Sequence, residues 1–304
     1  MGLKIVSIKS SLPHKSVNLN SAKYKKIIQA TGINKRYLSS KNEDVISLSI
    51  KSAKKILNDK LKNKISFLLF VSQTSPYKFP SISCILQNEL NLPRDIYAAD
   101  INMGCSGYIY ALKLARSLED LYNNRKYGLI ICSDTYTKYI EKNNKSCEPI
   151  FSDASTTTLV KISKKNQFQE FDFGVDGSGY QSLLLKENSK NMFMDGAKVA
   201  IFTIKEIPQF IKKFLLKNKL GERNIKYIAL HQASKYVCNK IKKKLRFNDN
   251  LFLENYHKYG NTVSSTIPLL LKDCIDKRKL KKNDIIIACG FGVGLSWGIV
   301  KIKW

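Results

Sequence analysis

The sequence has few histidines and arginines and no closely paired cysteines, and each shortage excludes a class of protein. Seven cysteines occur in 304 residues, but none belongs to a Cys-x-x-Cys pair, so we expect neither a metal site nor a disulfide framework. Only three histidines are present, at positions 14, 231 and 257. Because no cysteines are closely paired, most of them are expected to be reduced, buried thiols, and one of them is a candidate nucleophile.

Negative charge is also scarce, because 52 lysines and arginines face 24 acidic residues and the net charge is +28. Only seven of these 52 residues are arginine, and the lysines are scattered over the whole chain. Proteins that read bases and phosphates favour the forked arginine side chain, so we expect no nucleic-acid partner. Solvated lysine-rich faces are the simplest explanation of the charge, and an acidic carrier protein is the alternative.

Long apolar runs are missing as well. The uncharged stretch at residues 285–300 has 16 residues and contains four glycines, whereas a membrane-spanning helix needs about 20 apolar residues. Residues 1–9 alternate like a strand and lack the apolar block of a signal peptide. We therefore expect no membrane association and a cytoplasmic location.

The apolar residues that are present predict alternating strands and helices. Short, continuous apolar runs, typical of strands buried on both faces, occur at residues 66–71, 127–132 and 285–289. Apolar stripes with helical spacing begin after Asp44, Cys105 and Asn261. This alternation predicts an α/β fold with parallel or mixed sheets.

The two halves of the chain also resemble each other. Residues 70–75 (Phe-Val-Ser-Gln-Thr-Ser) resemble residues 229–234 (Ala-Leu-His-Gln-Ala-Ser), with an offset of 159 between the glutamines. The turn at Cys105 precedes the turn at Asn261 by 156 residues, and each is followed by a helical stripe. We therefore predict two similar halves, 1–165 with Cys105 and 166–304 with His231 and Asn261. Chemistry is expected where strands of the sheets end.

Cys105 is the candidate nucleophile. It lies between small residues in Gly-Cys-Ser-Gly, before a helical stripe, which predicts a sharp turn at the positive end of a helix dipole. Such a position lowers the pKa of a thiol. A structural, buried cysteine is the alternative, and the flanking glycines argue against it.

Two further polar residues stand beside predicted strand ends or turns. His231 follows the apolar run 227–230. It is either a hydrogen-bonded structural histidine or, as its small or polar neighbours predict, a ring exposed at the edge of a sheet. Asn261, in Gly-Asn-Thr, is either a turn and helix-capping residue or a neutral hydrogen-bond donor to a developing oxyanion. The glycine-rich residues 290–294 have the wrong spacing for a dinucleotide fingerprint, and we expect a loop whose N–H groups approach a reacting carbonyl.

These stretches together resemble the thiolase superfamily and, within it, the β-ketoacyl-acyl-carrier-protein synthase III family. The resemblance rests on motifs that occur in family order over almost the whole chain: residues 103–107 (Met-Gly-Cys-Ser-Gly), 231–234 (His-Gln-Ala-Ser), 260–262 with 267–269, and 290–298. The set Cys105, His231 and Asn261 resembles that of the initiating class of condensing enzymes. The resemblance implies a duplicated, five-layered αβαβα fold, a homodimer and a place in lipid metabolism such as fatty acid biosynthesis.

The resemblance also implies an activity. Cys105 would accept a starter acyl group from an acyl thioester, with its own backbone N–H and that of Val293 as the oxyanion hole. His231 and Asn261 would then stabilise the enolate formed by decarboxylation of a malonyl-acyl carrier protein, and the enolate would attack the acyl group on Cys105. No cofactor and no metal are implied.

Peripheral positions are carried over in the same way. Phe79 matches the aromatic residue that reaches across the dimer into the neighbouring acyl pocket. The basic helix that docks the acyl carrier protein is matched by Lys242, Lys243, Lys244 and Arg246. The chain departs from the family where coenzyme A is held: it has Lys26, Ala30, Lys145 and Tyr236 in place of the family's tryptophan and arginines. Whether the starter arrives on coenzyme A or on a carrier protein is therefore open.

Three functions consequently compete. The first is the condensing enzyme just described. The second is a synthase III-like acyltransferase that passes the acyl group from Cys105 to a hydroxyl or amine, for example of a sugar, without condensation; the altered coenzyme A positions motivate it. The third is a basic binding protein, which only the net charge of +28 supports.

Overall fold

Two β-sheets form the framework of the protein. The computed structural model describes residues 2–19, 25–118, 125–142, 144, 146–163 and 166–304. The first sheet has the strand order β1 (Gly2–Ser11), β7 (Ala154–Ser163), β6 (Tyr127–Asp134), β4 (Ile65–Val71) and β5 (Tyr97–Ile101). The second has the order β11 (Tyr227–Leu230), β12 (Ile285–Gly292), β13 (Ser296–Lys303) and β8 (Phe168–Val175). β4 pairs in parallel with β5 and β6, and β11 pairs in parallel with β12.

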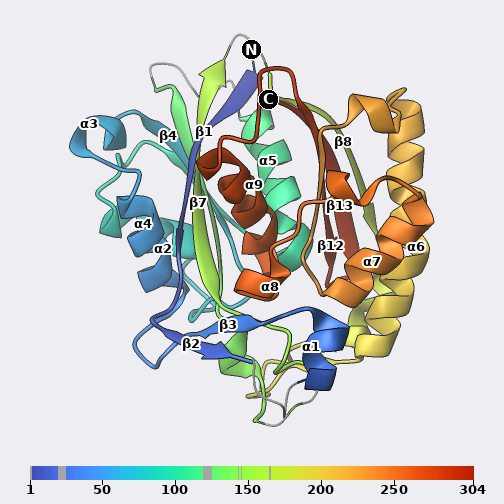
Figure 1. Cartoon of the computed structure of the whole chain (residues 1–304). Coiled ribbons are helices and arrows are strands. Elements are labelled where there is room, and N and C mark those ends of the chain that lie inside the picture. The colour runs from blue at the N-terminus through green and yellow to red at the C-terminus, as the bar shows by residue number, and fades with distance from the viewer. Residues whose placement is uncertain (1, 20–24, 119–124, 143, 145, 164–165) are drawn as a thin grey trace.

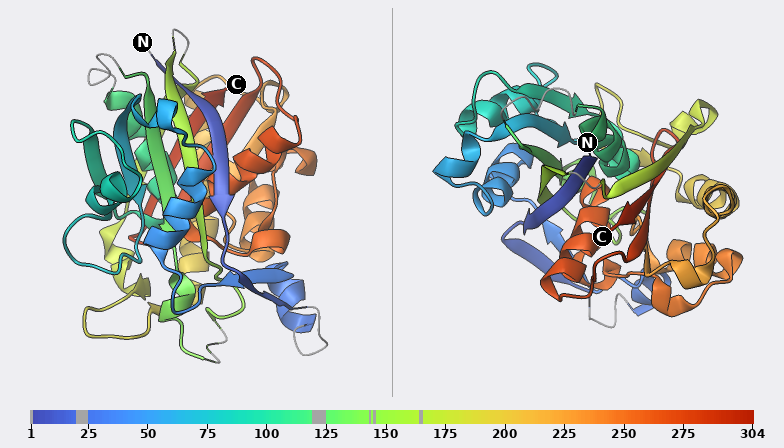
Figure 2. Two further views of the ribbon diagram at one scale, coloured as in Figure 1. Left: turned by 90° about the vertical axis from the view of Figure 1, so that its left-hand side faces the viewer. Right: turned by 90° about the horizontal axis from the view of Figure 1, so that it is seen from above.

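Two helices lie between the sheets, and further helices cover the outer faces (Figure 1). The inner pair is α5 (Gly107–Ser117) and α9 (Thr266–Asp276). The outer face of the first sheet carries α2 (Val45–Lys54) and α4 (Ile82–Glu89), and that of the second carries α6 (Gly196–Lys217) and α7 (Lys235–Leu245). The five layers confirm the predicted αβαβα fold, and the view from above in Figure 2 shows the same layering.

Smaller elements gather at the end of the molecule opposite the two termini (Figure 1). They include the hairpin β2 (Lys15–Asn18) and β3 (Lys35–Leu38), the helix α1 (Lys25–Thr31) and the strand pair β9 (Leu183–Leu184) and β10 (Phe193–Met194). The remaining short helices are α3 (Asp59–Lys62), α8 (Tyr256–Tyr259) and the 3₁₀ turns η2 (Gly104–Ser106), η4 (Tyr136–Tyr139), η5 (Gly177–Ser182), η6 (Glu222–Asn224), η7 (Asp249–Leu251) and η8 (Val263–Ser265).

Burial on both faces explains the apolar runs of the sequence. Every residue of β4 is buried, and β6 and β12 are buried except at their first residue. The inner helix α5 is likewise covered by both sheets, with Tyr108, Ile109 and Leu112 fully buried. The three predicted strands and the three predicted helical stripes are therefore confirmed.

Each predicted half supplies one of the two sheets, but the boundary between the halves falls on residues that the structure does not describe. The first sheet is built from residues up to Ser163 and the second from Phe168 onward. Residues 164–165, where the boundary was expected, lie outside the described residues, so the division into 1–165 and 166–304 stays a prediction. In the part of the chain that the structure describes, no helix is both long and apolar enough to span a bilayer.

Candidate active site

Cys105 lies on the turn η2, which leads directly into the inner helix α5. The turn requires glycine at position 104, whose φ is +48°. A Cβ there would also lie 2.3 Å from Oε1 of Gln73 and 2.7 Å from Cγ1 of Val293. The predicted sharp turn before a helix is confirmed, and Cys105 is buried, with 5% of the residue exposed.

The second sheet packs against this turn through its glycines. A Cβ on Gly290 would lie 2.7 Å from the carbonyl oxygen of Cys105, and one on Gly292 would lie 3.1 Å from Sγ. The sequence predicted a loop for residues 290–294, whereas β12 continues through Gly292. Glycine is thus needed here because a strand, not a loop, approaches the nucleophile. Val293 follows at the end of the strand.

His231 follows β11, as predicted, but its ring is buried rather than exposed, with 2% of the residue accessible. The ring packs edge-on against Phe291, with centroids 5.4 Å apart and an interplanar angle of 86°. Its Nδ1 lies within hydrogen-bond distance of the hydroxyl of Thr266, at 2.8 Å. Burial lowers the pKa of His231 to about 3, so the ring is neutral near pH 7.

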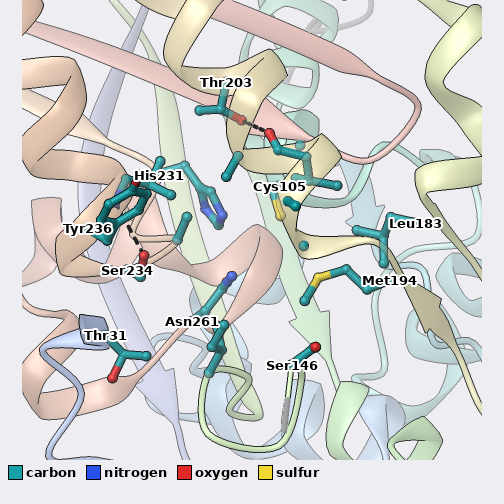
Figure 3. A pocket seen from close by; sticks show the side chains of 18 of the residues that line it. Thr31, Cys105, Ser146, Leu183, Met194, Thr203, His231, Ser234, Tyr236 and Asn261 are labelled. Carbon is teal, nitrogen blue, oxygen red and sulfur yellow. Dashed lines mark hydrogen bonds between the residues drawn. The ribbon is translucent and has the colours of Figure 1, made fainter. Parts of the chain in front are cut away.

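The side chain of Asn261 is held by its own loop. Its Oδ1 accepts a hydrogen bond of 2.9 Å from the backbone N–H of Val263, and its backbone is tied to residues 150 and 152. Because Oδ1 is occupied, the amide nitrogen is the group that points into the cavity, as Figure 3 shows. An amide nitrogen is a neutral donor and suits a developing oxyanion.

One cavity of about 740 Å³ brings the three predicted residues together. Cys105 comes from the first half, and His231 and Asn261 come from the second; all three line the cavity and point toward its centre (Figure 3). Thr31 and Tyr236 line another part of the cavity wall, together with α6 residues such as Ile201.

The electrostatics of Cys105 differ from the prediction. Burial raises the pKa of the thiol, and the carboxylate of Asp134 raises it further. The expectation of a lowered pKa is therefore wrong for this structure, because removal of the thiol from water outweighs the helix N-terminus. Cys105 is a protonated thiol near neutral pH in this state.

Four polar residues near the site were missed by sequence reasoning. Asp134 is fully buried and Thr266 is 1% exposed, while Gln73 accepts a 2.6 Å hydrogen bond from the hydroxyl of Tyr136. Three of them stand at or directly after the ends of β4 and β6, where α/β folds place their chemistry. Their position at strand ends could have marked these three as site residues. Nothing in the sequence marked Thr266, since a threonine at a helix start is ordinarily structural.

The predicted peripheral residues divide into exposed and buried ones. Lys243, Lys244 and Arg246 are exposed on and after α7. Lys242, by contrast, is 9% exposed, forms an ion pair with Glu254 and has its ammonium group 5.4 Å from the ring centre of Phe252. Lys242 thus helps to anchor α7 and is not part of the exposed basic surface.

The remaining peripheral residues lie at or outside the cavity. Ala30 and Tyr236 line it, and Lys26 is exposed on α1. Lys145 lies outside the described residues. Phe79 is 84% exposed and is not among the described residues that line the cavity of its own chain. Nor does the described part of the chain contain a group of three or more metal-ligating side chains.

The layered fold and the buried cysteine turn are those of a thiolase-like condensing enzyme. Sequence models of one family match two segments: "3-Oxoacyl-[acyl-carrier-protein (ACP)] synthase III" at residues 99–177, and the C-terminal part of the same family at residues 215–304.

Comparison with individual proteins points to the same family. The β-ketoacyl-[acyl-carrier-protein] synthase III of Clostridium perfringens (strain 13 / Type A) is 33% identical over 90% of this chain and 88% of its own length. That of Trichodesmium erythraeum is 27% identical over 100% of this chain and 99% of its own length. A crystal structure of a 3-oxoacyl-(acyl-carrier-protein) synthase III superposes with a TM-score of 0.93 at 27% identity, covering 100% of both chains. The chain therefore belongs to the 3-oxoacyl-[acyl-carrier-protein] synthase III family, a family of transferases.

Proposed function

We propose that the protein condenses a starter acyl group with the malonyl group of a malonyl-acyl carrier protein, through an acyl-Cys105 intermediate. The observation that carries the proposal is the convergence of Cys105, His231 and Asn261 on one cavity (Figure 3). Membership of the synthase III family supports the same reaction. Acyl thioesters are the only substrates and no cofactor takes part.

In the first half-reaction the sulfur of Cys105 attacks the carbonyl carbon of the acyl thioester. The new carbon–sulfur bond forms first and gives a tetrahedral intermediate, whose collapse breaks the old carbon–sulfur bond; the thiol proton leaves with the departing thiol. Backbone N–H groups of Cys105 and Val293 stabilise the tetrahedral oxyanion.

In the second half-reaction the malonyl thioester loses carbon dioxide, and the electron pair of the broken bond forms an enolate. The neutral ring of His231 and the amide of Asn261 hold the enolate oxygen. The enolate carbon then attacks the acyl group, giving a 3-ketoacyl-carrier, and the released Cys105 sulfur takes a proton from solvent. Both groups are uncharged, and each can hydrogen-bond to the enolate oxygen from a fixed position in the buried site.

The partner surface and the assembly belong to the same proposal. The exposed side chains of Lys243, Lys244 and Arg246 form a basic surface that complements an acidic carrier protein. We also propose a homodimer, in which the exposed ring of Phe79 is covered by the partner subunit. Sedimentation of the wild type against Phe79→Ser tests the dimer: equal, monomeric mass for both would refute it.

The test of the activity measures the two half-reactions separately. Intact mass after incubation with acyl-coenzyme A or acyl-carrier reports acylation, and carbon dioxide release from malonyl-carrier reports decarboxylation. Cys105→Ser should abolish both acylation and condensation, because a hydroxyl is a much weaker nucleophile. His231→Ala and Asn261→Ala should retain acylation and lose decarboxylation. Equal loss of both steps in these two variants would contradict the roles assigned to them.

A second candidate function is transfer of the acyl group to a hydroxyl or amine without condensation. The cavity wall motivates it, because Ala30 and the half-exposed Tyr236 stand where coenzyme A-contacting side chains were expected. An enzyme that forms acyl-Cys105, releases no carbon dioxide from malonyl-carrier and acylates an alcohol or amine would decide for this alternative.

A further inference from the structure

A carboxylate buried behind the nucleophile joins the two halves of the site. Asp134, at the end of β6, is fully buried. Its Oδ1 accepts hydrogen bonds from the backbone N–H of Gln73, at 2.9 Å, and from the hydroxyl of Ser72, at 3.4 Å. Its Oδ2 accepts one from the backbone N–H of Ser264, at 3.3 Å, and one from the hydroxyl of the same residue.

The bonds to Oδ2 hold a strained turn. Val263, directly before Ser264, has a φ of +52°, a conformation that a β-branched residue adopts only when its surroundings enforce it. The N–H of Val263 in turn donates to Oδ1 of Asn261. The turn from Asn261 to Ser264 is therefore fixed at one end by Asp134, and its conformation aims the amide of Asn261 into the cavity.

The hydrogen bonds to Oδ1 of Asp134 hold residues that lie beside Cys105. Gln73 is held by its backbone, and its Oε1 lies over Gly104, the residue before the nucleophile. The charge of Asp134 also raises the pKa of the Cys105 thiol, after the larger effect of burial. One carboxylate thus contacts both the strand end beside Cys105 and the turn that carries Asn261.

We propose that Asp134, in its ionised form, is a positioning residue for the decarboxylation step. An ionised carboxylate can accept from all four donors, whereas its protonated form gives up part of that capacity. Protonation should therefore loosen the strained turn and withdraw the amide of Asn261 from the enolate oxygen. This inference rests on the proposed function, since the affected step is the decarboxylation of malonyl-carrier.

The proposal predicts a dependence on pH that other groups of the site do not explain. Burial raises the pKa of Asp134 to about 6, whereas His231, with a pKa lowered to about 3, does not titrate in that range. The titratable groups that Asp134 meets have pKa values raised above neutral by burial; they are Cys105 on η2, Cys132 on its own strand and Tyr136 on η4. Ser72, Gln73 and Ser264, from the β4 and η8 sides, do not titrate.

The experiment compares Asp134→Asn, Ser264→Ala and the control Ser265→Ala. Ser265 is the next serine along, is also buried, and donates to the carbonyl of Cys132 instead of to Asp134. Carbon dioxide release from malonyl-carrier should fall roughly tenfold or more in Asp134→Asn and less in Ser264→Ala. Acylation of Cys105 should change by less than about threefold, and Ser265→Ala should match the wild type in the ratio of the two rates.

The pH profile separates positioning from a general loss of structure. Decarboxylation by the wild type should decline as the pH falls through about 6, and Asp134→Asn should lack this decline. Alkylation of Cys105 by iodoacetamide should shift to lower pH in Asp134→Asn, because a negative charge near the thiol is removed. Equal loss of both half-reactions, with both pH profiles unchanged, would overturn the proposal.

Failure of the proposed function gives a different result. A wild type that releases no carbon dioxide from malonyl-carrier refutes the condensing activity, and the alkylation profile, which needs no malonyl-carrier, then decides whether Asp134 acts on the thiol. Should Asp134→Asn not fold, Ser264→Ala carries the same comparison against Ser265→Ala.

Discussion

The hydroxyl of Thr266 lies 2.8 Å from Nδ1 of His231, and both residues are buried. This contact occupies one ring nitrogen, so Nε2 is the nitrogen left for a substrate. Thr266 is the first residue of α9, and its position is fixed because its backbone N–H also bonds to Val263. Among the described residues, the hydrogen-bond partner of the neutral His231 ring is therefore this buried hydroxyl and not a charged group.

Replacement of Thr266 tests that orientation. Thr266→Val keeps the shape and removes the hydroxyl, so Nδ1 loses its partner in a buried site. The loss of about 1–3 kcal/mol should lower the kcat of decarboxylation by roughly 5- to 150-fold. Thr266→Ser should retain activity. With only three histidines in the chain, nitrogen NMR of the His231 ring can follow the change directly; an unchanged ring signal in Thr266→Val would contradict the assignment.

Gly292 provides a second test, of the space beside the nucleophile. A Cβ on it would lie 3.0 Å from Cβ and 3.1 Å from Sγ of Cys105, so Gly292→Ala should push the thiol out of line and slow acylation roughly 10- to 100-fold. Gly177→Ala is the matched control, because nothing lies within 4 Å of its Cβ. Intact mass over time measures both. Acylation of Gly292→Ala at the wild-type rate would show that the strand has room to move.

The stability of the protein against acid supplies a third test, because two buried groups act with opposite sign. The pKa of His231 is lowered from 6.5 to about 3, so the unfolded chain binds its proton first and stability falls on acidification below about 6.5. The pKa of Asp134 is raised from 3.8 to about 6, so the folded chain binds its proton first and stability rises on acidification between about 6 and 4. Between pH 6 and 4 the two effects oppose each other at up to about 1.4 kcal/mol per pH unit each.

Single variants should separate the two contributions to the pH dependence of the free energy of unfolding. From pH 6 to 4, His231→Asn should gain stability relative to the wild type, and Asp134→Asn should lose it. Urea unfolding at several pH values measures both differences. Parallel curves for the wild type and both variants would mean that neither group changes its protonation on folding in this range.

The sequence allowed the α/β alternation and the three central residues to be predicted for a physical reason, whereas the five layers followed from the family resemblance. Strands buried on both faces must be continuously apolar, so β4, β6 and β12 are visible as runs. Cys105, His231 and Asn261 stand in local contexts of small and polar residues beside helix starts or strand ends. Both signals lie within a few neighbouring positions of the chain.

What could not be predicted depends on contacts between distant segments. Asp134 and Ser264 are 130 residues apart, and nothing in either neighbourhood shows that they meet. The burial of Lys242 depends on Glu254 and Phe252 in the same way. The direction of the Cys105 pKa shift was predicted wrongly because a helix N-terminus can be seen in sequence, whereas the loss of water around a side chain cannot.

The basic surface on α7 supports a fourth prediction, about the carrier protein. Lys243 and Lys244 are exposed, and charges at the rim of an interface act mainly on the association rate and its dependence on salt. Lys243→Glu with Lys244→Glu should therefore raise the KM for malonyl-carrier roughly tenfold, leave kcat nearly unchanged and reduce the effect of added salt. Lys281→Glu with Lys282→Glu, on the exposed loop before β12, is the control for the same change of net charge. An equal rise of KM in this control would place the docking surface elsewhere, because net charge without position would then explain the whole effect.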